Sequence, residues 1–64
     1  MNIWDYNYQK VRLTDTDGDV FVGCIIDISP AENEEQGEDC AALELIDGRI
    51  IGFYESEIRS IEIL

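Results

Sequence analysis

Apolar and polar residues alternate along most of this chain in short runs, and turn-forming residues separate the runs. A period of two is typical of strands with one buried face. The runs predict five strands, at residues 9–14, 19–28, 40–46, 49–54 and 58–64. Asp17-Gly18 and Asp47-Gly48 separate two pairs of these strands and predict two hairpins with type I′ turns. The pattern therefore predicts an antiparallel meander.

The second predicted strand is apolar on both faces and carries Gly23 near its middle. One face holds Val20, Val22, Cys24, Ile26 and Ile28, and the other holds Phe21, Gly23 and Ile25. Glycine inside a strand often marks a sharp bend. The predicted fold is therefore all-β, a five-stranded, bent antiparallel barrel of the SH3-like type, with a tight polar turn at 55–57. Its predicted core is Val11, Leu13, Phe21, Ile25, Leu43 and Ile61.

Two segments lie outside the predicted strands. Residues 1–8 form a lead-in segment, which predicts an extended stretch or a single docked turn because it is too short for a stable isolated helix. Residues 29–39 form an acidic loop, which is expected to be mobile, and Pro30 ends the strand before it.

The lead-in segment carries Trp4, Tyr6 and Tyr8 in phase with Lys10 and Arg12. Aromatic rings interleaved with cations can stack on bases and contact phosphates. The favoured interpretation is that the rings pack across the open end of the barrel or in a subunit contact.

Composition limits the function more than it identifies one. The 64 residues have room for a single domain, 1–64, and they carry 15 acidic against 4 basic residues, a net charge of −11. Such a surface repels phosphate backbones, so a nucleic-acid partner is not expected. No apolar run is long enough to span a membrane, and no secretory signal pattern is present. We expect a cytoplasmic protein with Cys24 and Cys40 reduced.

Residues 17–33 resemble the first motif of the Sm and LSm family. Gly18, Phe21, Gly23, Ile25 and Ile26 match its turn glycine, aromatic residue, second glycine and apolar pair in order. The motif then closes in the family with Asp-x-x-Met-Asn. Here residues 29–32 replace the first four positions of this closing segment, and Asn33 stands where the family has its Asn.

The family's second motif contains Arg-Gly, and Tyr54-Glu55 stand at that place in this chain. The resemblance implies that the RNA site of the family uses Asp, Asn and Arg side chains. Of these only Asn33 remains, as a residual ligand-site residue. The chain thus resembles a divergent Sm-like barrel of the bacterial or phage type, and LSm-type RNA binding is an alternative that the charge disfavours.

Catalytic and metal-binding chemistry has little support in the sequence. The chain has no histidine, which is the commonest general base at neutral pH. Asp15, Asp17 and Asp19 are spaced like the start of a calcium loop, but Val20 and Ile26 stand where such a loop needs Gly and Glu. We therefore expect no catalytic residue, no cofactor and no metal site; a small enzyme or an acidic metal-binding domain is the second alternative.

The predicted function is a non-enzymatic, self-associating assembly or interaction module, either a ring or a dimer. A different protein as partner stays an open alternative. In the Sm family the last strand pairs with the fourth strand of the next subunit. The resemblance therefore implies subunit-contact strands at 49–54 and 58–64. The predicted contact residues are Ile50, Gly52, Tyr54, Ile61 and Ile63.

Overall fold

The structure of this protein is a computed structural model that describes residues 2–64. It contains five strands, β1 (Lys10–Asp15), β2 (Val20–Ser29), β3 (Cys40–Leu45), β4 (Ile50–Tyr54) and β5 (Ile58–Ile63). Three short 3₁₀ turns accompany them, η1 (Ile3–Tyr6), η2 (Ala31–Asn33) and η3 (Glu55–Glu57). The strand positions and the turn at 55–57 confirm the prediction to within a residue at each strand end.

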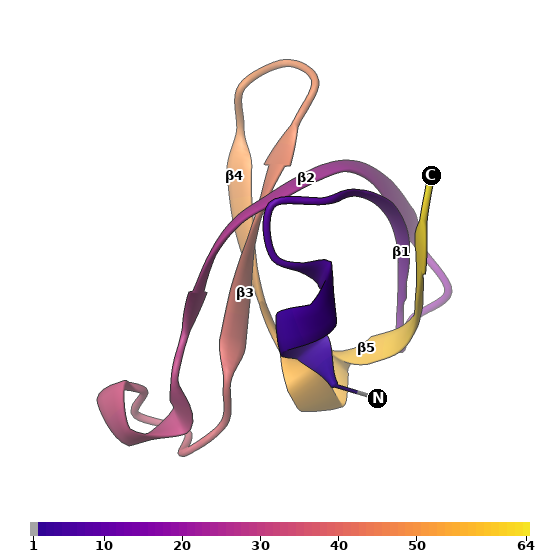
Figure 1. The fold of residues 1–64 in the computed structure, drawn as a ribbon. Helices are drawn as coiled ribbons and strands as arrows, with labels where there is room; N and C mark the ends of the chain where they lie inside the picture. Colours follow the sequence, from indigo (N-terminus) through magenta and orange to yellow (C-terminus); the bar gives the residue numbers. More distant parts are fainter. Residues whose placement is uncertain (1) are drawn as a thin grey trace.

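The strands form one antiparallel sheet in the order β4-β3-β2-β1-β5, which confirms the predicted all-β, barrel-like fold. β2 is the central strand, and it pairs with β1 along its first half and with β3 along its second half. The sheet curls around this strand, so β4 and β5 become its two edges (Figure 1).

Gly23, which the sequence predicts to mark a bend, pairs with both neighbouring strands. A Cβ atom added there would lie 2.2 Å from the carbonyl oxygen of Glu44. Contacts under 3.0 Å are essentially never seen for a real Cβ, so this approach of two backbones requires glycine.

The predicted phase of β2 is wrong after Ile25. The register shifts between Ile25 and Asp27, so an extra residue at Ile26 turns the strand by one position. Val20 and Val22 are exposed, while Ile28 is buried and therefore lies on the opposite face from them.

Both hairpin turns also differ from the predicted type I′ form. The N–H of Gly18 donates to the Asp15 carbonyl, and the N–H of Gly48 donates to the Leu45 carbonyl. The φ angles of the two glycines are +88° and +90°, whereas the aspartates before them have negative φ. Each hairpin thus has a three-residue loop, a turn followed by a left-handed glycine.

The core gathers on the concave side of the sheet. Four predicted core residues, Val11, Leu13, Ile25 and Leu43, are fully buried. Phe21 and Ile61 are only partly buried and pack against this core. The other core residues, which the strand pattern did not identify, are Ile3, Ile28, Ala41, Phe53 and Ile58.

The lead-in segment forms η1, a single docked turn, and the extended alternative is wrong. Figure 1 shows η1 within the opening of the curled sheet, and Ile3 is fully buried there. Tyr6 packs against the core, while Tyr8 is 76% exposed. Ile3 therefore fills the open end with Tyr6 packed against the core, and Tyr8 takes no part. None of the helical turns in residues 2–64 is long and apolar enough to cross a membrane.

Candidate functional site

The outer side of β5 has no neighbouring strand among residues 2–64. The N–H of Leu64 donates to the carbonyl of Lys10 (2.9 Å), so these two residues form a hydrogen-bonded pair. Such pairs alternate with non-hydrogen-bonded pairs along antiparallel strands. By this alternation, the N–H and C=O groups of Ile61 and Ile63 point away from β1. β5 therefore offers two ladder positions to another strand.

The outer side of β4 is the opposite edge of the same sheet. The N–H of Leu45 donates to the Arg49 carbonyl (2.8 Å), which fixes the hydrogen-bonded positions of the β3–β4 pair. The alternation then points the main-chain groups of every second β4 residue away from β3. These residues are Ile50, Gly52 and Tyr54.

One of these three positions already has a partner. The N–H of Tyr54 donates to Oε1 of Glu57 in η3 (2.9 Å). Ile50 and Gly52 therefore carry the outward-pointing N–H groups of β4 that no side chain in the described chain engages. The residue pattern did not identify Glu57 as this acceptor. Its position three residues after the end of a strand, at a polar turn, is the signal that could have identified it.

Exposed isoleucines flank both edges. Ile50 is 58% exposed and Ile63 is 54% exposed, whereas Ile61 is partly buried. Gly52 has no side chain to keep another backbone at a distance. The five predicted contact residues thus divide between two edges that do not pair with each other within one chain. They can meet only between two copies.

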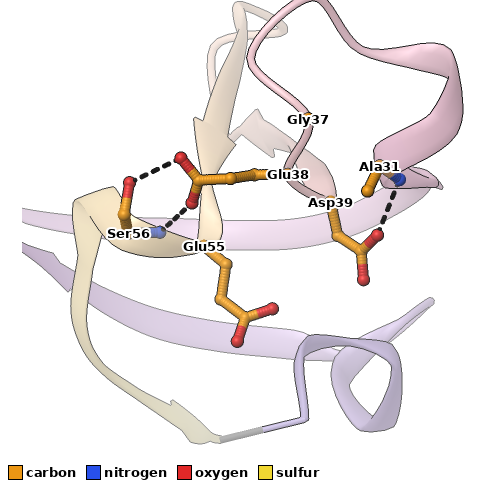
Figure 2. Close-up of a pocket in the computed structure, with 6 residues that line it drawn as sticks. All are labelled: Ala31, Gly37, Glu38, Asp39, Glu55 and Ser56. Atoms are coloured by element: carbon orange, nitrogen blue, oxygen red, sulfur yellow. Dashed lines mark hydrogen bonds between the residues drawn. The ribbon is translucent and has the colours of Figure 1, made fainter.

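Glu38 and Asp39, at the end of the acidic loop, accept four hydrogen bonds with their side chains, three from residues outside the loop and one from Ala31 within it. Glu38 accepts from both the N–H and the hydroxyl of Ser56 (2.9 Å each), as Figure 2 shows. Asp39 accepts from the N–H of Ala31 and from the indole N–H of Trp4 (2.8 Å each). The loop, expected to be mobile, is therefore fixed at its C-terminal end, and Trp4 serves as an anchor for it.

A hollow of about 560 Å³ lies beside this loop, lined by Ala31, Gly37, Glu38, Asp39, Glu55 and Ser56 (Figure 2). Three of the six lining residues are carboxylates, and none is a cation. The residual Sm-type residue, Asn33, lies in η2 and does not line the hollow. A phosphate group would meet only negative charge here.

The thiol of Cys40, the residue after Asp39, is not activated. Burial raises the pKa of Cys40, and the negative charges of Glu34 and Glu57 raise it further. Loss of solvation, followed by a hydrogen bond to Glu34, also raises the pKa of Tyr54. Both groups therefore stay protonated at neutral pH, which does not suit a nucleophile or a general base.

The carboxylates of Asp15, Asp17 and Asp19 come together in the first hairpin turn, with ligand atoms within 4.8 Å of one another. Oδ1 of Asp15 accepts from the N–H groups of Asp17 (3.0 Å) and Asp19 (2.9 Å). These two bonds hold the turn together through its own first carboxylate.

Comparison with known proteins shows the fold alone. No protein-family model and no curated protein matches the chain. A solved structure described as YaeO bound to magnesium, from Vibrio cholerae O395, is similar with a TM-score of 0.71. The match has 24% sequence identity and covers 89% of this chain and 69% of that one. The chain therefore has a small all-β fold that occurs in another solved protein.

Proposed function

We propose that this chain is a non-enzymatic, self-associating interaction module with an Sm-like barrel, whose copies pair through β4 of one subunit and β5 of the next. The observation that carries the proposal is the pair of open sheet edges. Each edge offers two outward ladder positions, and each is flanked by an exposed isoleucine. Proteins usually blunt such edges with charge, proline or a bulge.

Pairing between two different edges is heterologous, so it forms a ring where the rotation closes. Repulsion between copies that each carry −11 opposes it. That repulsion is screened beyond about 8 Å at physiological ionic strength, whereas main-chain bonds and isoleucine contacts act at contact distance. Association should therefore be stronger in salt than at low ionic strength.

Light scattering in physiological salt tests the proposal, with Ile63→Pro as the central variant. The Ile63 N–H points away from β1, so proline there removes a donor of the free edge and leaves the β1–β5 ladder intact. We expect a mass above the monomer for the wild type and a lower mass for Ile63→Pro. Ile63→Ala is the matched control, because it removes the side chain but keeps the N–H. A wild-type monomer at tens of micromolar would refute edge pairing.

RNA binding of the LSm type is the alternative function. Tyr54-Glu55 replaces the Arg-Gly pair of the family, and the hollow beside it is lined by carboxylates. Each phosphate contact needs a cation that this surface does not supply. Fluorescence anisotropy with oligo-uridine at physiological salt should give no saturation. Saturable binding at low micromolar protein would restore the RNA-binding interpretation.

Magnesium is named in the description of the similar structure, and within residues 2–64 one group of carboxylates, the aspartates of the first turn, is a candidate site for it. Oδ1 of Asp15 is already engaged by two N–H groups there, and magnesium demands near-ideal octahedral geometry. We propose that the chain does not depend on the ion. Millimolar magnesium should leave the melting temperature unchanged, compared with an equal ionic strength of sodium chloride.

A further inference from the structure

The convex side of the sheet carries a hollow of about 520 Å³, distinct from the sheet edges. It lies between β1, β2 and the start of the β3–β4 turn. Its lining residues are Lys10, Val22, Gly23, Cys24, Glu44, Leu45 and Ile46. Ile46 is fully exposed and Val22 is 42% exposed, so the wall is apolar and uncovered. Exposed apolar groups that gather around a hollow are typical of an interaction surface.

Three of these residues form a row across the strands. Lys10 lies opposite Cys24 in the β1–β2 ladder, and Cys24 lies opposite Glu44 in the β2–β3 ladder. Residues directly opposite each other point to the same face of a sheet. The row therefore has a cation at one end, a thiol in the middle and a carboxylate at the other end. The ion pairs recorded in residues 2–64 include neither Lys10 nor Glu44.

This face is nearly neutral in a strongly acidic protein. Besides Lys10 and Glu44 it carries the exposed ion pair of Arg12 with Glu62 (2.9 Å) and the exposed Asp27, which lies opposite Ala42. Two cations and three carboxylates leave a charge of −1 here, so −10 of the net charge of −11 lies elsewhere on the molecule. A basic partner would be drawn to those other surfaces. A second copy of this chain meets the least repulsion here.

We propose that the convex face is a two-fold contact between two copies of this chain. A two-fold axis that runs along β2 between two facing sheets exchanges the ends of the row. Lys10 of each copy then lies across from Glu44 of the partner copy, and Cys24 faces its own counterpart. Val22 and Ile46 supply the apolar area. A contact of this kind is isologous and closed, unlike the heterologous pairing of the edges. It does not rest on the edge pairing.

Charge reversal tests the row. Sedimentation equilibrium should show that Lys10→Glu and Glu44→Lys each weaken the dimer at least about tenfold, because each places like charges opposite each other. The double variant should regain the wild-type dissociation constant, and it has the wild-type net charge. Both residues are exposed, so the substitutions leave the core intact. Single variants without effect, or a double variant without rescue, would overturn the proposal.

The edge variant Ile63→Pro separates this contact from the edge pairing. Because edge pairing joins further copies to this dimer, we expect Ile63→Pro to lower the mass only as far as the dimer, which Glu44→Lys then dissociates. A monomeric Ile63→Pro protein would refute the convex-face contact and leave the edge pairing standing. A wild-type dimer that Ile63→Pro leaves unchanged and Glu44→Lys dissociates would support the convex-face contact and refute the edge pairing.

Discussion

The two Asp-Gly hairpins have the same five-residue turn geometry, but the other residues of the two turns differ, and so do their contacts. Residues 15–19 and 45–49 both close with a hydrogen bond from a left-handed glycine. The first turn begins with Asp15, whose carboxylate binds two N–H groups inside the turn. The second turn begins with Leu45 and takes its carboxylate from Asp47. That carboxylate accepts hydrogen bonds from the N–H and the side chain of Arg49.

The difference continues beyond the turns. The first hairpin lies against the rest of the fold, because the N–H of Thr16 donates to the carbonyl of Glu57 (3.1 Å). The second extends away from the body of the sheet (Figure 1). At the position of Thr16 it presents Ile46 to solvent. The dipeptide thus fixes the local turn, and the position of the turn in the sheet decides whether its side chains are free for contact.

The largest expected effect concerns Gly23, where the two hairpins join through β2. Gly23→Ala would drive a Cβ into the Glu44 carbonyl and should cost roughly 4 kcal/mol or more, enough to abolish cooperative folding. Gly52→Ala is the control, since its Cβ would meet only the Cys40 sulfur at 3.3 Å. Thermal melts followed by circular dichroism compare the two. A cooperative melt of Gly23→Ala near the wild-type temperature would contradict the close approach of the Gly23 and Glu44 backbones.

The next largest expected effect is the loss of stability when the aromatic residue of each hairpin is replaced by alanine. Phe21 and Phe53 pack with ring centroids 5.2 Å apart, but only Phe53 is buried. Phe53→Ala should cost about 3–5 kcal/mol, and Phe21→Ala less, about 2–3 kcal/mol. The sequence alone, which places Phe21 in the core, predicts the larger value for it. Urea denaturation measures both, and equal losses would remove the distinction between the hairpins.

Asp15 provides a smaller test of how the first turn is built. Asp15→Ala removes the acceptor of two N–H groups and should cost about 1–1.5 kcal/mol. Asp47→Ala, the matched change in the second turn, should cost less because its contacts involve only Arg49. Urea midpoints compare the two variants with the wild type. An equal or larger loss for Asp47→Ala would show that both turns depend on their carboxylates alike.

The second turn should show its carboxylate in the pH dependence of the protein. The N–H of Arg49, followed by its side chain, lowers the pKa of Asp47. A lowered folded-state pKa stabilises the fold above the unfolded-state pKa, and this support is lost as the pH falls through the folded-state value. Carboxyl NMR titration should therefore place Asp47 below its ordinary range. Arg49→Ala removes the side chain but keeps the N–H, so it should raise the pKa of Asp47 only part of the way to its ordinary value. An unchanged titration in that variant would refute the contribution of the Arg49 side chain.

The smallest effect on stability is expected at the tip of the second hairpin. Ile46→Thr gives the second turn the residue of the first, and it should change the free energy of unfolding by less than about 0.5 kcal/mol. Self-association through the convex face should weaken in the same variant. The reverse change, Thr16→Ile, is the control and should leave association unchanged. A loss of stability in Ile46→Thr would mean that the tip is docked after all.

The positions of the strands were predictable from local pattern, because alternation and turn residues are properties of neighbours in sequence. Gly23 was predictable for the same reason. The bulge at Ile26 was not, since one extra residue reverses the phase of a strand without changing its composition. The burial of Ile3 was also missed, because it depends on where η1 docks in the curled sheet.

The candidate site was predictable only in part. The resemblance to the Sm family selected strands that prove to be the sheet edges, but main-chain direction depends on the hydrogen-bond register, which the residue pattern does not contain. The Lys10–Cys24–Glu44 row was not predictable for the same reason, because it depends on the strand register. Its members are 34 residues apart at the extremes, and only the pairing of three strands aligns them.

The bond from Tyr54 to Glu57 sets a limit on the growth of ordered aggregates. An amyloid template needs a run of about six residues whose main-chain groups all accept the next strand. Glu57 ends the free edge of β4 after Gly52, and η3 then turns the chain away. The free edge of β4 is therefore shorter than the run of about six residues that such a template needs.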